Sequence, residues 1–201
     1  PSHTEWRKRG LEPDTRALER SLVDMDQYMR EHPVQDMQEM NEALQRHFTG
    51  VTVDTRVTTP TLPLDQAQDL CYQAFGAHGR RRVQLAREAL KTCRDCADAY
   101  VILAESADST EKAWEFYSQG VAAGERSLGT EIFQQGVGHF WCTLSTRPYM
   151  RARLGLADTL DKLGRAEEAI DHYQELLRLN PNDNQGVRYL LMPKLLQFGR
   201  D

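Results

Sequence analysis

The chain has 201 residues, enough for one extended stack of helices or for one or two globular units. Its net charge of -5 argues against a general nucleic-acid binder, because such proteins are usually basic. No run of about 18 apolar residues is present, so we expect no membrane-spanning segment. Four cysteines are too few for a disulfide framework, and a reducing cytoplasm is the expected location.

Residues 1–48 are predicted to hold a polar arm and a helical hairpin. Apolar residues at helical spacing indicate a first helix over about 15–32, for which Asp14 is the expected cap. Pro33 breaks this helix, and a second helix is expected over about 34–48. We expect the hairpin to cap the N-terminal end of the helical stack that follows, because terminal repeats are often atypical.

Residues 49–63 are rich in Thr and Val and contain two prolines. A short strand is possible by propensity, but no partner strand is evident. We interpret the stretch as a linker, which makes it the boundary between the hairpin and a repeat domain over residues 64–201.

From residue 64 onward the apolar pattern is helical, and equivalent positions recur about 34 residues apart. The pattern predicts helix pairs over about 64–93, 97–124 and 149–180, with a final helix over 184–198. An insertion over 125–148 separates the second pair from the third. We expect the insertion to fold as one or two short helices on the stack, and long loops in compact folds are often functional.

The clearest pair lies between Tyr149 and Pro181. Its first helix carries an apolar stripe that includes Leu156 and Leu160, and Gly164 supplies the left-handed residue that commonly ends a helix. Neither helix can hide its apolar stripe alone, so the pair is expected to pack on neighbouring pairs.

Leu156-Ala157, Gly164, Ala169, Tyr173 and Pro181 resemble the tetratricopeptide repeat (TPR), a helix-turn-helix of about 34 residues. The resemblance implies an all-α fold, a right-handed α-α superhelix of the TPR-like solenoid type with an N-terminal helical hairpin. It also implies a non-enzymatic scaffold that binds a protein or peptide partner through its concave face.

Two further resemblances are more specific. The runs 139–141, 147–151 and 180–184 are similar to uncharacterised bacterial TPR proteins. The stretch 96–125 is more weakly similar to the suppressor-of-tumorigenicity family of TPR-like proteins. These families imply a cytoplasmic helical scaffold, and they supply no catalytic residue.

The concave face should be formed by the first helix of each pair, and the repeat alignment directs Asp98 and Glu105 toward it. Arg151 and Arg188 are predicted to pair with acidic groups of the partner, while Tyr149 and Trp141 are predicted to make apolar contacts. The complete set of predicted partner-binding residues is Arg151, Arg188, Tyr149, Trp141, Arg147 and Asp158.

The basic run Arg80, Arg81 and Arg82 has two interpretations. It is typical of a solvated helix start, which we prefer. The alternative is a site for an acidic partner or for nucleic acid, whose binding would weaken steeply with salt. A second alternative function is self-association, in which the final helix buries Val187, Leu191 and neighbouring leucines against a second copy.

No cofactor, metal or catalytic constellation is predicted. Cys93 and Cys96 have metal-ligand spacing, but there is no second such pair, so a packing role is preferred. Cys142 lies near His139 in sequence, but no third group is indicated, so we expect no nucleophilic catalysis.

Overall fold

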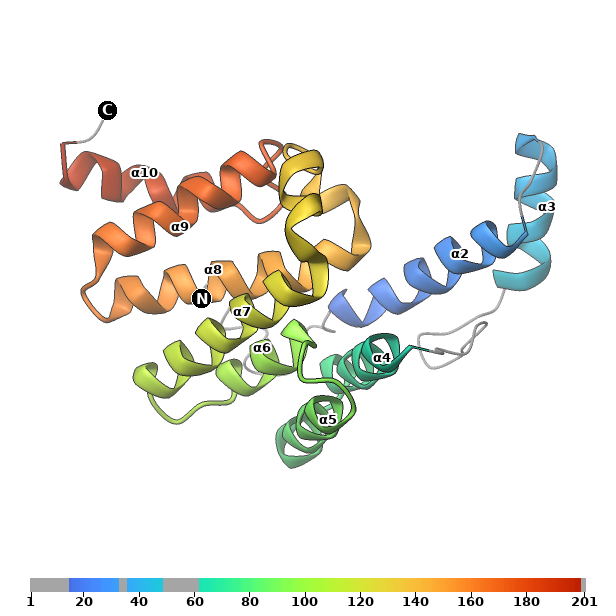
Figure 1. Ribbon diagram of the computed structural model, residues 1–201, viewed down its shortest axis with the longest axis horizontal. Helices are drawn as coiled ribbons and strands as arrows, with labels where there is room; N and C mark the ends of the chain where they lie inside the picture. The colour runs from blue at the N-terminus through green and yellow to red at the C-terminus, as the bar shows by residue number, and fades with distance from the viewer. Residues whose placement is uncertain (1–14, 33–35, 49–61, 200–201) are drawn as a thin grey trace.

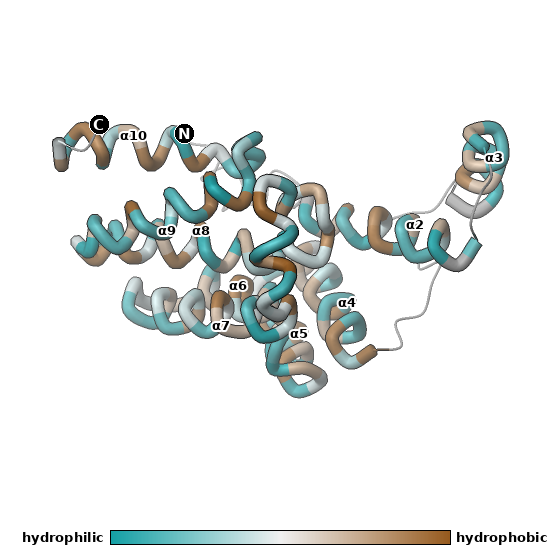
Figure 2. Tube along the Cα trace, turned by 45° about the horizontal axis from the view of Figure 1, so that its top comes forward, coloured by the Kyte–Doolittle hydropathy of each residue, from teal (hydrophilic) through white to brown (hydrophobic). Residues whose placement is uncertain are grey.

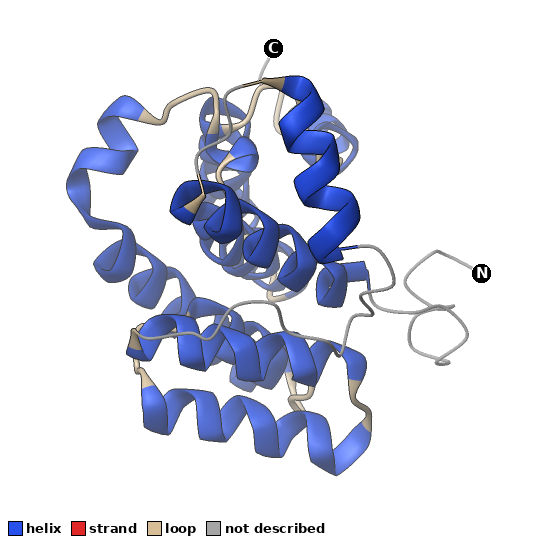
Figure 3. Cartoon of the chain, turned by 90° about the vertical axis from the view of Figure 1, so that its right-hand side faces the viewer, coloured by secondary structure: helices blue, strands red, loops and turns tan. Residues whose placement is uncertain are grey.

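The computed structural model describes residues 15–32, 36–48 and 62–199. Within these ranges every regular element is helical, so the all-α class is confirmed (Figures 1 and 3). The elements are η1 (Thr15–Leu18), α2 (Glu19–Glu31), α3 (Met37–Phe48), α4 (Pro63–Gly76), α5 (Gly79–Thr92), α6 (Ala97–Glu105), α7 (Thr110–Gln135), η2 (Phe140–Cys142), η3 (Leu144–Thr146), α8 (Arg147–Lys162), α9 (Ala166–Leu179) and α10 (Val187–Gln197).

Helices α4 to α10 form a stack in which each helix packs against the next (Figure 1). In addition, α4 contacts α6, and α6 contacts α8. These three helices therefore form a continuous layer on one side of the stack. None of the helices in the described ranges combines the length and the apolar character that crossing a bilayer requires.

Local sequence signals explain several helix boundaries. Pro63 is the first residue of α4, where a helix makes no use of the N–H that proline lacks. Gly164 follows α8 with φ 78°, as predicted from its left-handed preference. At α10, the Asp183 carboxylate accepts the N–H of Val187 at 2.6 Å and of Arg188 at 3.0 Å.

The apolar core has two clusters of buried side chains. One joins α4, α5 and α6 and includes Phe75, Leu85 and Ile102. The other runs from α7 to α10 and includes Tyr149 and Tyr173. Both clusters combine alanines with larger side chains, which lets neighbouring helices approach closely.

Helix α7 is longer than expected. The sequence suggests an end near residue 124, but the helix continues to Gln135 through a kink at Gly129, where φ is 72° and ψ is 167°. Beyond the kink, Phe133 packs 5.2 Å from the Phe140 ring and 5.0 Å from the Tyr149 ring, measured between centroids. Burial of these aromatic rings against α8 explains why the insertion folds onto the stack, with η2 and η3 leading into α8.

The N-terminal hairpin does not close the end of the stack. Instead, η1 contacts α4, and α2 lies between α4 and η3. Helix α3 stands apart at the far end of α2, as both views show (Figures 1 and 2). The predicted cap Asp14, the break at Pro33 and residues 49–61 of the predicted linker lie outside the described residues.

Candidate functional site

One surface of the α4, α6 and α8 layer is marked by Asp69, Asp98, Glu105, Arg147 and Arg151, and we call it the inner groove. Residues 15–32, called here the N-terminal segment, lie across it at their N-terminal end. One short stretch of this segment reaches α4, α6 and α8 through charged side chains, which are described in turn below.

Arg151 of α8 lies at the centre of the inner groove. Its Nε and Nη2 atoms donate to the two carboxylate oxygens of Asp98 on α6, at 2.8 and 2.6 Å. Its Nη1 atom donates to the Glu19 carboxylate of the N-terminal segment at 2.8 Å. Asp98 is fully buried and also accepts a hydrogen bond from Gln68 at 2.7 Å. Two helices and the segment therefore meet on one guanidinium.

The charge of Arg151 is maintained although it is buried. Burial disfavours the charged form, but the carboxylates of Asp98 and Glu19 outweigh this and raise the pKa of Arg151. The same surroundings act on the Tyr72 hydroxyl, since burial, Asp98 and Glu19 all raise its pKa. Arg151 is therefore a buried ion-pair centre whose anionic partners are Asp98 and Glu19 of the chain itself, so the predicted acidic group of a partner would have to take the place of Glu19.

A second guanidinium shares the Glu19 carboxylate. Arg147 Nη1 lies 3.2 Å from Glu19 Oε1, and Arg147 Nε donates to the Trp141 carbonyl at 3.0 Å. The Arg147 guanidinium also lies 5.1 Å from the centroid of the Trp141 ring. Arg147 and Trp141 were both predicted as site residues, and the structure brings them together beside Arg151.

Arg16 makes the contact at the other side of the groove. Its guanidinium donates to both carboxylate oxygens of Glu105 on α6, at 2.6 and 3.0 Å. It also stacks over the Phe75 ring of α4, 4.2 Å from the centroid. Glu105 additionally pairs with Arg82, one member of the basic run. The Glu105 carboxylate thus holds one cation from the segment and one from α5.

Between these contacts, the side chains that the segment directs toward the groove are small or charged. Arg20 Nε lies 3.0 Å from Asp69 on α4, and Ala17 is buried in the α4–α6 cluster. Leu18 and Leu22, by contrast, are 51% and 41% exposed. The segment therefore docks mainly through charge complementarity, and its leucines face away from the groove.

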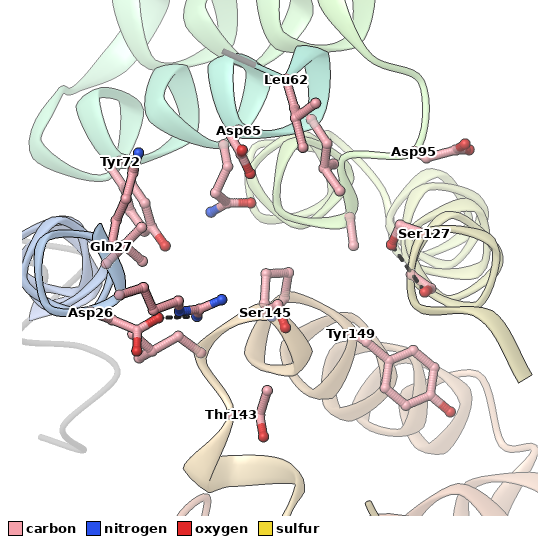
Figure 4. Close-up of a pocket in the computed structure, with 18 residues that line it drawn as sticks. Asp26, Gln27, Leu62, Asp65, Tyr72, Asp95, Ser127, Thr143, Ser145 and Tyr149 are labelled. Carbon is pink, nitrogen blue, oxygen red and sulfur yellow. Dashed lines mark hydrogen bonds and ion pairs between the residues drawn. The ribbon is translucent and has the colours of Figure 1, made fainter. Parts of the chain in front are cut away.

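A cavity of about 410 Å³ lies beside the docked segment, between α2, α4, α7 and the start of α8 (Figure 4). Figure 4 shows Gln27 of α2 and Tyr72 of α4 on one side of the cavity and Tyr149 of α8 on the other. The lining is mixed, since half of its residues are polar or charged, with Asp26, Arg30, Asp65 and Asp95 among them. Its apolar residues include Val23, Leu62, Leu64, Tyr72, Leu144 and Pro148.

The remaining predicted site residues lie elsewhere. Tyr149 is 1% exposed and belongs to the core, so it is not available for a partner. Asp158 accepts the Tyr173 hydroxyl at 2.6 Å, and burial raises the pKa of the Asp158 carboxyl. Arg188 is exposed on α10 and donates to the Pro181 carbonyl at 2.6 Å. The structure therefore joins three of the six residues, and the other three are separate from them.

The basic run is divided by the structure. Arg82 is half-buried and paired with Glu105, whereas Arg80 and Arg81 are exposed on α5. Arg80, Arg82, Arg87 and Lys91 line an open groove of about 900 Å³.

The cysteine pair Cys93 and Cys96 is also divided. Cys96 is buried with its sulfur 3.5 Å from that of Cys71, whereas Cys93 is half-buried. Burial and the thiol–thiol hydrogen bond with Cys96 raise the pKa of the Cys71 thiol. In the described part of the chain, no group of three or more His, Cys, Asp or Glu side chains has an arrangement that could hold a metal ion.

The most informative residues of the groove were absent from the predicted site. These are Arg16, Glu19 and Arg20 on the segment. In sequence they read as the solvated charges of an amphipathic helix, since Arg20 and Asp24 have the spacing of a surface pair. The alanine at position 17, between charged residues, was the one local sign that this face is buried.

Comparisons of the chain with protein-family models, with curated proteins and with solved structures find no match. A function for this chain therefore rests on the inner groove, its ion pairs and the segment that occupies it.

Proposed function

We propose that the protein is a non-catalytic interaction scaffold whose inner groove binds a helical segment of a partner protein. The observation that supports this is the seating of one short helical stretch across α4, α6 and α8 by matched charges. Arg16 meets Glu105, Glu19 meets Arg151, and Arg20 meets Asp69. Grooves that hold amphipathic helices are a recurring mode of peptide recognition.

We further propose that α4–α10 form a right-handed superhelix of the TPR type in a cytoplasmic protein. The resemblance of residues 149–181 to that repeat supports this. So does the order of contacts, in which first helices of successive pairs touch. Close approach at glycine is a third support, since an added Cβ at Gly124 would lie 2.8 Å from the Tyr149 Cβ.

Affinity capture from cells tests the scaffold proposal. The bait is the full chain, and the groove variants are Glu105→Arg and Arg147→Glu, which reverse charges at the edge of the inner groove. The matched control is Arg188→Glu on exposed α10. Proteins recovered by wild type and by the control, but lost from both groove variants, would support the proposal. Recovery of the same proteins by all four baits would refute it.

A second candidate is a site for an acidic partner on α5. Its support is that Arg80, Arg87 and Lys91 line one open groove, and none of these three has a described ion pair. The net charge of -5 makes nucleic acid the less favoured ligand. Binding of an acidic peptide that weakens with salt and with Arg80→Glu would support this candidate. Salt-independent binding, or none, would remove it.

Self-association through α10 is a third candidate. Val187 and Leu191, which the sequence assigned to a partner-facing stripe, are buried within the stack. The outward surface instead holds Tyr189, Met192 and Leu196, which are 86%, 57% and 75% exposed. Light scattering tests the idea, and a strict monomer at high concentration would refute it.

A further inference from the structure

We infer that the inner groove selects a partner helix with a fixed order of charges and one large apolar side chain, and that the N-terminal segment is the internal competitor of that helix. This inference rests on the proposed scaffold function. The charge order is basic, acidic, basic, read at the positions of Arg16, Glu19 and Arg20. The apolar position is that of Val23.

The charge order follows from three pairs that span separate helices. The first basic position meets Glu105 on α6, and the second meets Asp69 on α4. The acidic position between them meets two guanidiniums of α8, Arg147 and Arg151. A helix with the opposite order would place like charges together at each point, and like-charge contacts reject wrong partners. The groove therefore discriminates by the sequence of signs along one helical turn.

The groove does not need the segment in order to stay folded. Arg151 keeps both of its hydrogen bonds to Asp98 when Glu19 leaves, so the buried guanidinium remains paired. The apolar contacts of the segment come from two small side chains, Ala17 in the α4–α6 cluster and the partly buried Val23, while Leu18 and Leu22 are exposed. A segment held mainly by ion pairs can be exchanged for a better helix.

The cavity beside Val23 shows where a partner helix would gain binding affinity over the N-terminal segment. Val23 lies one helical turn after Glu19 and lines the cavity of about 410 Å³. Leu64, Tyr72 and Leu144 line the same space from α4 and η3. A leucine or larger side chain at this helix position would reach apolar surface that valine leaves uncovered.

A peptide-binding experiment tests the inference. The probe is a synthetic peptide of residues 15–32 with a fluorescent label, measured by anisotropy. The two proteins are the full wild-type chain and the full chain carrying Glu19→Arg and Arg20→Glu, which releases the segment. An internal competitor has an effective concentration on the order of millimolar, so the released chain should bind the peptide at least about tenfold more tightly.

Peptide variants test the two features separately. Val23→Leu in the peptide should tighten binding by about fourfold, the effect of one buried methylene group. Glu19→Arg in the peptide should abolish binding. Leu18→Ala is the matched control, because that side chain faces away from the groove, and its affinity should be unchanged.

Equal peptide affinity for the two proteins would overturn the internal competitor, and no gain from Val23→Leu would overturn the apolar position. Circular dichroism checks that the released chain is folded, and Arg20→Glu alone serves as a milder second release variant. The scaffold proposal is judged separately by cellular capture. If the released chain captures groove-dependent proteins but ignores the peptide, this inference fails and the scaffold stands.

Discussion

Removal of the Asp98 carboxylate is the most direct test of the ion-pair centre. In Asp98→Ala, the buried Arg151 guanidinium loses two hydrogen bonds and keeps a single one to Glu19. Breaking a buried ion pair by deleting one partner costs about 3–5 kcal/mol. For a chain of this size each kcal/mol lowers Tm by about 2–4 °C, so we expect a decrease of about 6–20 °C.

The matched perturbation is Glu19→Ala. Here Arg151 retains its two-point contact with Asp98, and water can reach the groove once the segment loosens. The buried charged hydrogen bond from Arg151 is worth about 1.5–3 kcal/mol, the longer and part-buried one from Arg147 adds less, and release of the segment offsets part of the loss. The decrease in Tm should therefore be clearly smaller than for Asp98→Ala, while trypsin cleavage after Arg16 and Arg20 should become faster.

Thermal and guanidinium unfolding of the two variants provide the comparison. Addition of Arg151→Met to Asp98→Ala should restore much of the lost stability, because no buried charge is left unpaired. Equal destabilisation by Asp98→Ala and Glu19→Ala would show that the segment is part of the core and would refute this reasoning. Failure of the double variant to recover would also contradict it.

Three further predictions concern packing and pH. Gly155→Ala should destabilise the protein by about 1–3 kcal/mol or more, because the new Cβ would lie 2.1 Å from the Tyr117 ring. Gly76→Ala is the control, because an added Cβ there meets open space. Equal denaturation midpoints for the two variants would contradict the packing of Gly155 against Tyr117. Burial and Arg153 lower the pKa of His172 below 6.5, so the free energy of unfolding should decrease as the pH falls through 6.5 and below. Urea titrations between pH 7.5 and 5.5 should show this pH dependence in the wild type, and His172→Gln should remove it. Burial raises the pKa of Asp158 above 3.8, so the charged carboxylate opposes folding at neutral pH. Asp158→Asn should therefore raise the free energy of unfolding more at pH 7 than at pH 4. A lower stability of the variant at pH 7 would contradict the raised pKa.

Much of the helical architecture could be predicted because its signals are local. Apolar periodicity and Gly164 mark helices through backbone chemistry that acts within a few residues, whereas α4 begins at Pro63, inside the predicted linker. The extension of α7 was missed because Gly129 also reads as a stop, and only the aromatic packing beyond it makes the helix resume. That packing involves residues distant in sequence, so no local pattern contains it.

The site was predicted only in part for a related reason. Arg151 contacts Asp98 of α6, but the spacing of Arg151 in the sequence carries no information on what covers that face of α8. The apolar stripe of the N-terminal segment suggested that Leu18 and Leu22 are buried, whereas charge pairing turns them outward. Pairing of charges between distant segments leaves no periodic trace, so the self-occupied groove could be found only from the structure.

The shared carboxylate of Glu105 has a consequence for communication across the protein. Arg16 of the N-terminal segment and Arg82 of α5 both bind it. An anion that draws Arg82 away would leave the whole carboxylate to Arg16 and so strengthen the segment's hold on the groove. Thermodynamic reciprocity then requires that release of the segment strengthens Arg82 on Glu105 and weakens the anion by the same factor. The outer surface of α5 and the inner groove are thus linked through one side chain.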